Sequence, residues 1–177
     1  MSISLRDLFE ARSSVRKYKS DIVPPEKIAR ILQSVTSTVP TAGNLQAYKI
    51  VVVTDPKVKE AIYNASHKQN QILEAPVLFV FFANTLRSSE KYHTRGVELF
   101  AIQDAANACM MASLACTEEG LGTCWVGAFH DSSIREILGA GEGMRPTSIL
   151  TVGFPQSTTK RTKTRRGFSD LVSFDKC

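Results

Sequence analysis

Residues 97–119, VELFAIQDAANACMMASLACTEE, constrain the fold more than any other stretch of this chain. They are the longest segment with helical periodicity, and they are apolar over most of the helix circumference. A helix of this kind is buried on all sides, either in a core or in a subunit interface. Its most apolar part is too short for a bilayer and is flanked by Gln103, Asp104 and Glu118, so we expect no membrane span.

Shorter helices and strands are expected on both sides of this segment. Residues 24–35 place apolar side chains at i, i+3, i+4 and i+7 after two prolines, which predicts an amphipathic helix. Ser4 caps a shorter predicted helix, whose Leu5, Leu8 and Phe9 would form its inner face. Further helices are predicted at 56–72 and 131–139, and strands at 48–54, 76–83, 147–155 and within 120–130.

This order of elements predicts one domain, residues 1–177, of the α+β class: an α/β sandwich on a sheet of four or five strands. The run at 76–83 is continuously apolar, as in a strand that is buried on both faces. Residues 84–96, NTLRSSEKYHTRG, are expected to form a loop.

The cysteines and histidines give no support for a metal site. The four cysteines form no CxxC pair and three lie in or beside apolar stretches, so we interpret them as buried reduced thiols. The three histidines show no ligand spacing. The first 14 residues lack an apolar signal core, which favours a cytoplasmic protein.

The net charge of +5 is local. Five basic residues lie in KRTKTRR, residues 160–166, and the rest of the chain has 17 basic and 17 acidic residues. Such a run can be a solvated tail, a nucleic-acid contact or one wall of an anion site.

A second basic segment, RSSVRKY at residues 12–18, suits an anion. In an extended chain Arg12, Ser14 and Arg16 point to one side, and in a helix the two arginines are one turn apart. Two guanidinium groups and a hydroxyl fit a phosphate dianion, because paired N–H donors match phosphate oxygens. A solvated basic turn is the alternative interpretation.

Motifs of the common nucleotide-binding and hydrolase classes are missing from the sequence. GAGEG, residues 139–143, follows a predicted helix instead of a strand, so we expect a loop and not a dinucleotide fingerprint. No Walker A or GxSxG sequence is present.

Five pieces occur in one order along the chain: RSSVRKY, PTAGNLQAY, GLGTCWVGAF, TSILTVGFP and KRTKTRR. In this order and spacing they closely resemble the nitroreductase family of FMN-dependent oxidoreductases. The resemblance implies a central, mostly antiparallel sheet flanked by helices, in a domain-swapped homodimer with two FMN sites at its interface. It also implies that residues 97–119 lie in this interface and that residues 156–177 extend to the partner subunit.

The resemblance assigns FMN contacts to matching residues of this chain. The phosphate and part of the ring would be held by Arg12, Ser13, Ser14, Arg16, Lys163 and Arg165, with Arg12 paired with the phosphate and Arg16 either at the phosphate or at the pyrimidine edge of the flavin. Pro40, Thr41 and Ala42 would come from the partner subunit, with the amides of Asn44 and Gln46 at the polar edge of the flavin ring. Val126, Gly127 and Ala128 would line the ring with backbone amides, although Gly127 taken alone fits a strand bulge equally well.

The implied activity is hydride transfer from NADH or NADPH to flavin N5, followed in a ping-pong cycle by reduction of a small acceptor such as a nitroaromatic or a quinone. No catalytic residue is assigned, because the flavin performs the chemistry, and neither a nucleic-acid nor a membrane partner is expected. Tyr92, His93 and Arg95 either line the acceptor channel or are ordinary exposed residues. The alternatives are a flavin-binding protein of a specialised branch, in flavin metabolism or dehalogenation, and a nucleic-acid-binding module that uses residues 160–166.

Overall fold

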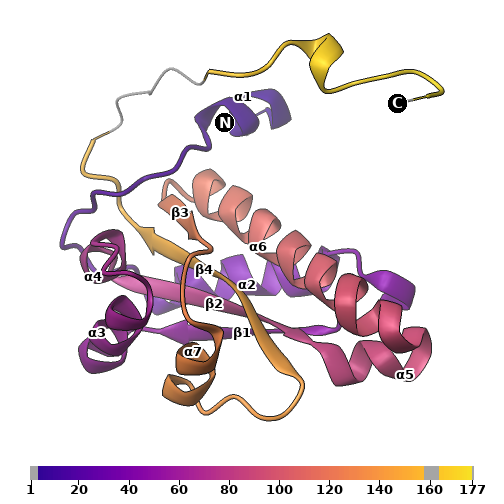
Figure 1. Ribbon diagram of the computed structural model, residues 1–177. Helices are drawn as coiled ribbons and strands as arrows, with labels where there is room; N and C mark the ends of the chain where they lie inside the picture. The colour runs from indigo at the N-terminus through magenta and orange to yellow at the C-terminus, as the bar shows by residue number, and fades with distance from the viewer. Residues whose placement is uncertain (1–3, 158–163, 177) are drawn as a thin grey trace.

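The protein is described here by a computed structural model, which covers residues 4–157 and 164–176. Its centre is a four-stranded antiparallel sheet with the order β1-β2-β4-β3 (Figure 1). The strands are β1 (Tyr48–Val53), β2 (Val77–Asn84), β3 (Gly122–Val126) and β4 (Met144–Gly153). The predicted α+β class and antiparallel sheet are therefore confirmed, and β3 lies at an edge of the sheet.

Helices cover both faces of this sheet. They are α1 (Leu5–Ala11), α2 (Pro25–Thr38), α3 (Pro56–Ala65), α4 (Gln71–Glu74), α5 (Thr85–Arg95), α6 (Ala101–Glu118) and α7 (Asp131–Ile137), with short turns at Ala42–Asn44, Gly96–Phe100 and Phe168–Asp170. Phe79 and Phe81 of β2 pack in one core with α2 and α6. Leu78, Val80 and Phe82 pack in a second core with α3, α4 and α7. β2 is thus buried on both faces, as its apolar run predicts.

The apolar helix α6 buries only one stripe in the single chain. Its buried residues recur every three or four positions from Ala101 to Cys116 and pack against the sheet and α2. The helical stretch Thr85–Glu118, which is kinked at His93, is long and apolar enough to cross a membrane, but its buried stripe packs as in the core helix of a soluble protein. Met110 stays 39% exposed, so another side of α6 remains available to a partner subunit.

Most of the segment 84–96 forms helix α5 (Thr85–Arg95), so the predicted loop is wrong. The Asn84 side chain accepts a hydrogen bond from the Arg87 N–H at 3.0 Å and caps the helix. The Tyr92 ring packs edge-on against Phe100, with ring centroids 4.9 Å apart, and this contact joins α5 to the turn that precedes α6. The polar composition of this segment did not indicate a helix, and the Asn84 cap and the contact between Tyr92 and Phe100 help to stabilise the one that forms.

Two smaller predictions are also wrong. The helix expected at 56–72 is broken, because His67 and Lys68 adopt left-handed backbone, with φ of 51° and 53°, between α3 and α4. The inner face expected for α1 is not buried in the single chain, where Leu5 and Phe9 are 64% and 54% exposed.

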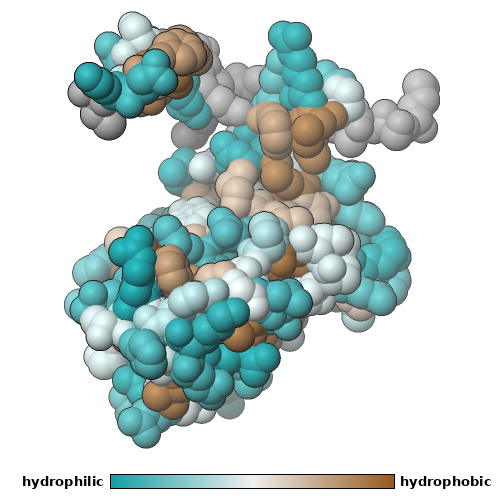
Figure 2. Space-filling model, turned by 90° about the vertical axis from the view of Figure 1, so that its right-hand side faces the viewer, coloured by the Kyte–Doolittle hydropathy of each residue, from teal (hydrophilic) through white to brown (hydrophobic). Residues whose placement is uncertain are grey.

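Exposed apolar side chains gather near both ends of the chain (Figure 2). They include Leu5 and Phe9 of α1 and Phe168, Leu171 and Phe174 of the C-terminal segment, whose Arg165 lines one pocket with residues of α1. The extension of residues 156–177 to a partner subunit stays a prediction.

Cys109, Cys116 and Cys124 are buried and free, as expected. Cys177 lies outside the described residues. Within the described ranges, no group of three or more His, Cys, Asp or Glu side chains is arranged to hold a metal ion.

Candidate functional site

The RSSVRKY segment runs in extended form along the free edge of β3. The Val15 N–H donates to the Thr123 oxygen at 2.8 Å, and Ser14 pairs with Thr123 in a parallel bridge. The Lys19 N–H donates to the Phe154 oxygen at 2.9 Å and continues the attachment beyond β4. Of the two conformations considered from the sequence, the extended one is therefore present.

Two close contacts fix this segment on the sheet. The Tyr18 hydroxyl lies 2.7 Å from the Val15 oxygen, to which it donates, and 2.6 Å from Thr151 Oγ1. Burial raises the pKa of Tyr18 well above its ordinary value, so this phenol stays neutral. A Cβ at Gly122 would lie only 2.7 to 2.9 Å from three Val15 side-chain atoms, so glycine is required for the close approach.

Arg12 and Arg16 bring positive charge to the same part of β3. Burial raises the pKa of the Cys124 thiol, and the charges of Arg16 and Arg12 both act to lower it. Both guanidinium groups therefore lie near Cys124. This agrees with the alternation of an extended chain, which places Arg12, Ser14 and Arg16 on one side.

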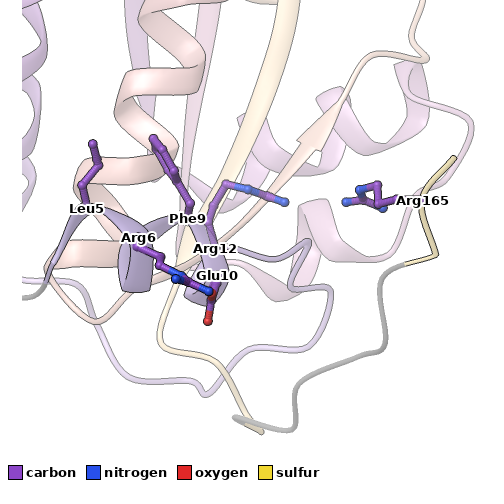
Figure 3. Close-up of a pocket in the computed structure, with 6 residues that line it drawn as sticks. All are labelled: Leu5, Arg6, Phe9, Glu10, Arg12 and Arg165. Carbon is purple, nitrogen blue, oxygen red and sulfur yellow. The ribbon is translucent and has the colours of Figure 1, made fainter. Parts of the chain in front are cut away.

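Arg12 also lines a pocket of about 690 Å³ with Arg165 (Figure 3). The other lining residues are Leu5, Arg6, Phe9 and Glu10, all from α1. Arg6 Nε lies 3.2 Å from Glu10 Oε1, so the one carboxylate of the pocket is paired. The next basic residue, Arg166, instead lies 4.0 Å from the Asp170 carboxylate. Lys163 lies outside the described residues.

The loop of residues 40–46 is built on the first half of α6. The Ala42 N–H donates to Asp104 Oδ1 at 2.9 Å, and the Gln46 N–H donates to Thr41 Oγ1 at 3.1 Å. Asn44 and Gln46 are exposed, have left-handed backbone, and bond to each other through Gln46 Nε2 and Asn44 Oδ1 at 2.7 Å. The loop therefore presents two preorganised amides to solvent.

Asp104 is the residue of this region for which the sequence left two roles open, an interface hydrogen-bonding group or a satisfied polar group of the core. It is only 2% exposed; burial raises its pKa, and the backbone N–H groups of Ala42 and Ala47 lower it. Asp104 thus anchors the loop within its own chain. The signal was present in the sequence as a carboxylate in an otherwise apolar helix, although its partner could not be identified there. A second pocket of about 440 Å³ lies beside it, lined by Pro40, Thr41, Ala42, Phe100, Gln103 and Asn107.

Val126 is the last residue of β3, and Gly127 and Ala128 directly follow it. The ladder to β4 is regular up to the pair of Val126 with Ile149, and Gly127 lies beyond it, so the strand bulge is excluded. Gly127 and Ala128 are exposed, and within the described part of the chain no backbone acceptor takes up their N–H groups. A Cβ at Gly127 would meet only the Trp125 ring, at 3.6 Å, so the chain itself does not require glycine there.

Within the single chain, two of the three groups of predicted residues, 12–16 and 126–128, lie along β3. Ser14 pairs with Thr123, and Gly127 follows four residues later, about 13 Å along an extended chain. The loop of residues 40–46 lies elsewhere. Its anchor Asp104 is nine residues from Ser113, which contacts Thr123 through hydroxyls 2.7 Å apart, and this separation is about 14 Å along the helix axis.

Comparisons with known proteins match both the sequence and the fold. A Thermus thermophilus protein named NADH dehydrogenase is 41% identical over 73 residues, covering 41% of this chain and 35% of that protein. A Bacillus subtilis protein named FMN reductase (NADPH) is 26% identical over 155 residues, covering 80% of this chain and 62% of that protein. The solved structure of B. megaterium NfrA2 aligns with a TM-score of 0.88 at 26% identity, covering 97% of this chain and 74% of that one.

The matched regions thus span less than two thirds of the length of both sequence relatives. The model of the Nitroreductase family matches residues 9–75 and 69–154, which include the RSSVRKY segment, the loop of residues 40–46 and all four strands of the sheet. The resemblance found in the sequence motifs is therefore confirmed, and the chain belongs to the nitroreductase family.

Proposed function

We propose that this protein binds FMN and acts as an NAD(P)H-dependent oxidoreductase on a small electron acceptor. The observation that carries the proposal is the pocket in which Arg12 and Arg165, distant in sequence, lie across from each other (Figure 3). The names of the relatives support it, since one relative is named for FMN and NADPH and another for NADH.

The residues at this pocket fit a phosphate. Arg12 and Arg165 supply guanidinium donors, and Arg16 adds positive charge beside the same strand. Glu10 would repel an anion if it were unpaired, but its pairing with Arg6 reduces that effect. The Ser13 and Ser14 hydroxyls lie between the arginines in sequence and would complete the set.

The end of β3 fits a flavin ring. The N–H groups of Gly127 and Ala128 are exposed, and Gly127 leaves space for a planar group to approach the backbone. The segment that contains Ser14 pairs with β3, and these amides follow the end of the same strand, as a ligand with an anionic end and a flat polar ring requires.

When bound, FMN would accept a hydride from NADH or NADPH at N5 and then reduce the acceptor, in a ping-pong cycle. The protein residues hold the phosphate, orient the ring and donate backbone hydrogen bonds where negative charge develops. No side chain is assigned as an acid or base. A nitroaromatic or a quinone is the expected class of acceptor, because a flat electrophile can stack on the ring.

A homodimer accounts for the distance between the loop of residues 40–46 and the phosphate pocket. The loop is bonded to Asp104, whereas Thr123, which pairs with Ser14, contacts Ser113 about 14 Å further along α6, and this offset favours a loop that serves the site of a partner chain. In a two-fold dimer packed through the uncovered side of α6, the loop of each chain would reach the site of the other. The exposed apolar side chains of α1 and the C-terminal segment would be covered by the same partner.

The visible spectrum of the purified protein tests the proposal. Bands of oxidised flavin, release of FMN on denaturation and anaerobic bleaching by NADH or NADPH would support it. Bound flavin that neither donor bleaches would instead indicate a passive flavin carrier or a specialised branch of the family. A colourless protein that also fails to take up added FMN would refute the proposal.

A further inference from the structure

Gln69 joins the turn between α3 and α4 to the segment that would line the flavin ring. Its Nε2 donates to the backbone oxygens of Ser66 at 3.1 Å and Ala128 at 3.0 Å. Its Oε1 accepts a hydrogen bond from Gln71 Nε2 at 3.1 Å. Both N–H donors and the oxygen of the carboxamide are therefore used, and only one orientation of the group satisfies all three contacts.

The segment held by Gln69 has few other restraints. Across residues 127–130, the described chain provides two backbone hydrogen bonds, both at His130: its N–H donates to the Ala65 oxygen at 2.9 Å, and its oxygen accepts from the Ile134 N–H at 3.1 Å. The rings of His67 and His130, with centroids 5.0 Å apart, make another contact between the same two segments. The bond from Gln69 to Ala128 is therefore the restraint closest to the two exposed N–H groups.

We infer that Gln69 is a positioning residue, which holds the Ala128 carbonyl and thereby directs the N–H groups of Gly127 and Ala128 toward the flavin ring. This inference rests on the proposed function, because it requires FMN at this place. Backbone donors preorganised toward developing negative charge stabilise the reduced ring more than the oxidised ring. Loss of the Gln69 bond would therefore weaken binding of reduced flavin more than binding of oxidised flavin.

Gln69→Met tests this role, because methionine keeps the length of the side chain and removes its N–H donors. Gln69→Glu is the second variant, since a carboxylate would place a negative oxygen against two carbonyls. Gln33→Met, at an exposed position on α2, is the matched control. Each variant is saturated with FMN before its two-electron midpoint potential and its anaerobic reduction by NADH and NADPH are measured.

Gln69→Met is expected to bind oxidised FMN nearly as well as the wild type, because the phosphate contacts remain. A tenfold loss of affinity for reduced relative to oxidised flavin would shift the potential by about 30 mV to more negative values. Reduction by the nicotinamide donor would slow in parallel, and Gln33→Met would match the wild type.

A wild-type potential in flavin-saturated Gln69→Met and Gln69→Glu overturns the inference while the proposed function stands. Failure of the wild type to bind FMN overturns both, so the two failures are distinguishable. If neither variant folds, Gln69→Asn decides the question, because its shorter side chain cannot keep the bonds to both Ser66 and Ala128. A more negative midpoint potential in flavin-saturated Gln69→Asn supports the inference, and a wild-type potential overturns it.

Discussion

Arg165→Ala is expected to weaken FMN binding about tenfold without unfolding the protein. A hydrogen bond to a charged group contributes about 1.5–3 kcal/mol, and about 1.4 kcal/mol corresponds to a factor of ten in affinity. Arg165 is exposed, so solvent and salt screen its charge and the lower end of that range applies. Arg12 is half-buried in the same pocket, so Arg12→Ala is expected to have the larger effect.

Arg166→Ala is the matched control for this experiment. Arg166 has the same charge and adjoins Arg165, but its guanidinium is directed to Asp170, with Nε 4.0 Å from the carboxylate. Flavin-free protein of each variant is titrated with FMN, and quenching of flavin fluorescence gives the dissociation constant. Thermal unfolding of the flavin-free variants should agree with the wild type, because exposed substitutions change stability by about 0.5 kcal/mol or less.

Equal and small losses of affinity in Arg165→Ala and Arg166→Ala would refute the reasoning. That result would mean that the basic run acts only through its total charge, and the nucleic-acid alternative would regain support. Unchanged affinity in both Arg12→Ala and Arg165→Ala would refute the assignment of the pocket to the phosphate.

Gly127→Ala is expected to weaken flavin binding and to keep the unfolding free energy within about 0.5 kcal/mol of the wild-type value. Gly122→Ala should lose about 1–3 kcal/mol of stability, because its methyl group would meet Val15. Denaturant unfolding and FMN titration of both variants check these expectations. Tyr18→Phe removes the hydrogen bond to the Val15 oxygen and should cost about 1 kcal/mol at neutral pH by the same unfolding assay. Stability should fall above about pH 9, because burial raises the pKa of Cys109 to about 12 and that of Tyr18 above 10. Above this pH the unfolded chain releases protons that the folded chain retains, so each group lowers the unfolding free energy by up to about 1.4 kcal/mol per pH unit. An unfolding free energy that stays constant from pH 7 to 11 would contradict this.

The sequence predicted those features that depend on local pattern. The period-two alternation of residues 12–18 survives because the segment pairs with the edge of β3, and the apolar run of β2 survives because helices cover both of its faces. The break after α3 could not be predicted in this way. His67 and Lys68 adopt a conformation that usually requires glycine or asparagine, so the sequence carried no turn signal there.

Contacts between distant residues were beyond the reach of local pattern. Nothing in the spacing of Arg12 and Arg165 indicates that they line one pocket, and only the resemblance to a family suggested it. The spacing of Asp104 and Ala42 likewise gave no sign of their contact, and this bond explains why a carboxylate is placed in an apolar helix. The assignment of individual residues to FMN stays a prediction, because the structure supplies their arrangement and not their ligand.

Gly122 begins β3 and Gly127 directly follows its end, and the structure gives these two glycines of one motif different roles. In GLGTCWVGAF, Gly122 and Gly127 carry the same information, since either residue could serve a turn, a bulge or a close approach. In the fold, Gly122 is required by Val15, whose side chain occupies the space that a Cβ would need. Gly127 has no such neighbour, and it exposes its N–H at the end of the strand that carries the arginine segment. We therefore attribute Gly122 to folding and Gly127 to the ligand, and the paired alanine variants separate these roles by the property that each one loses.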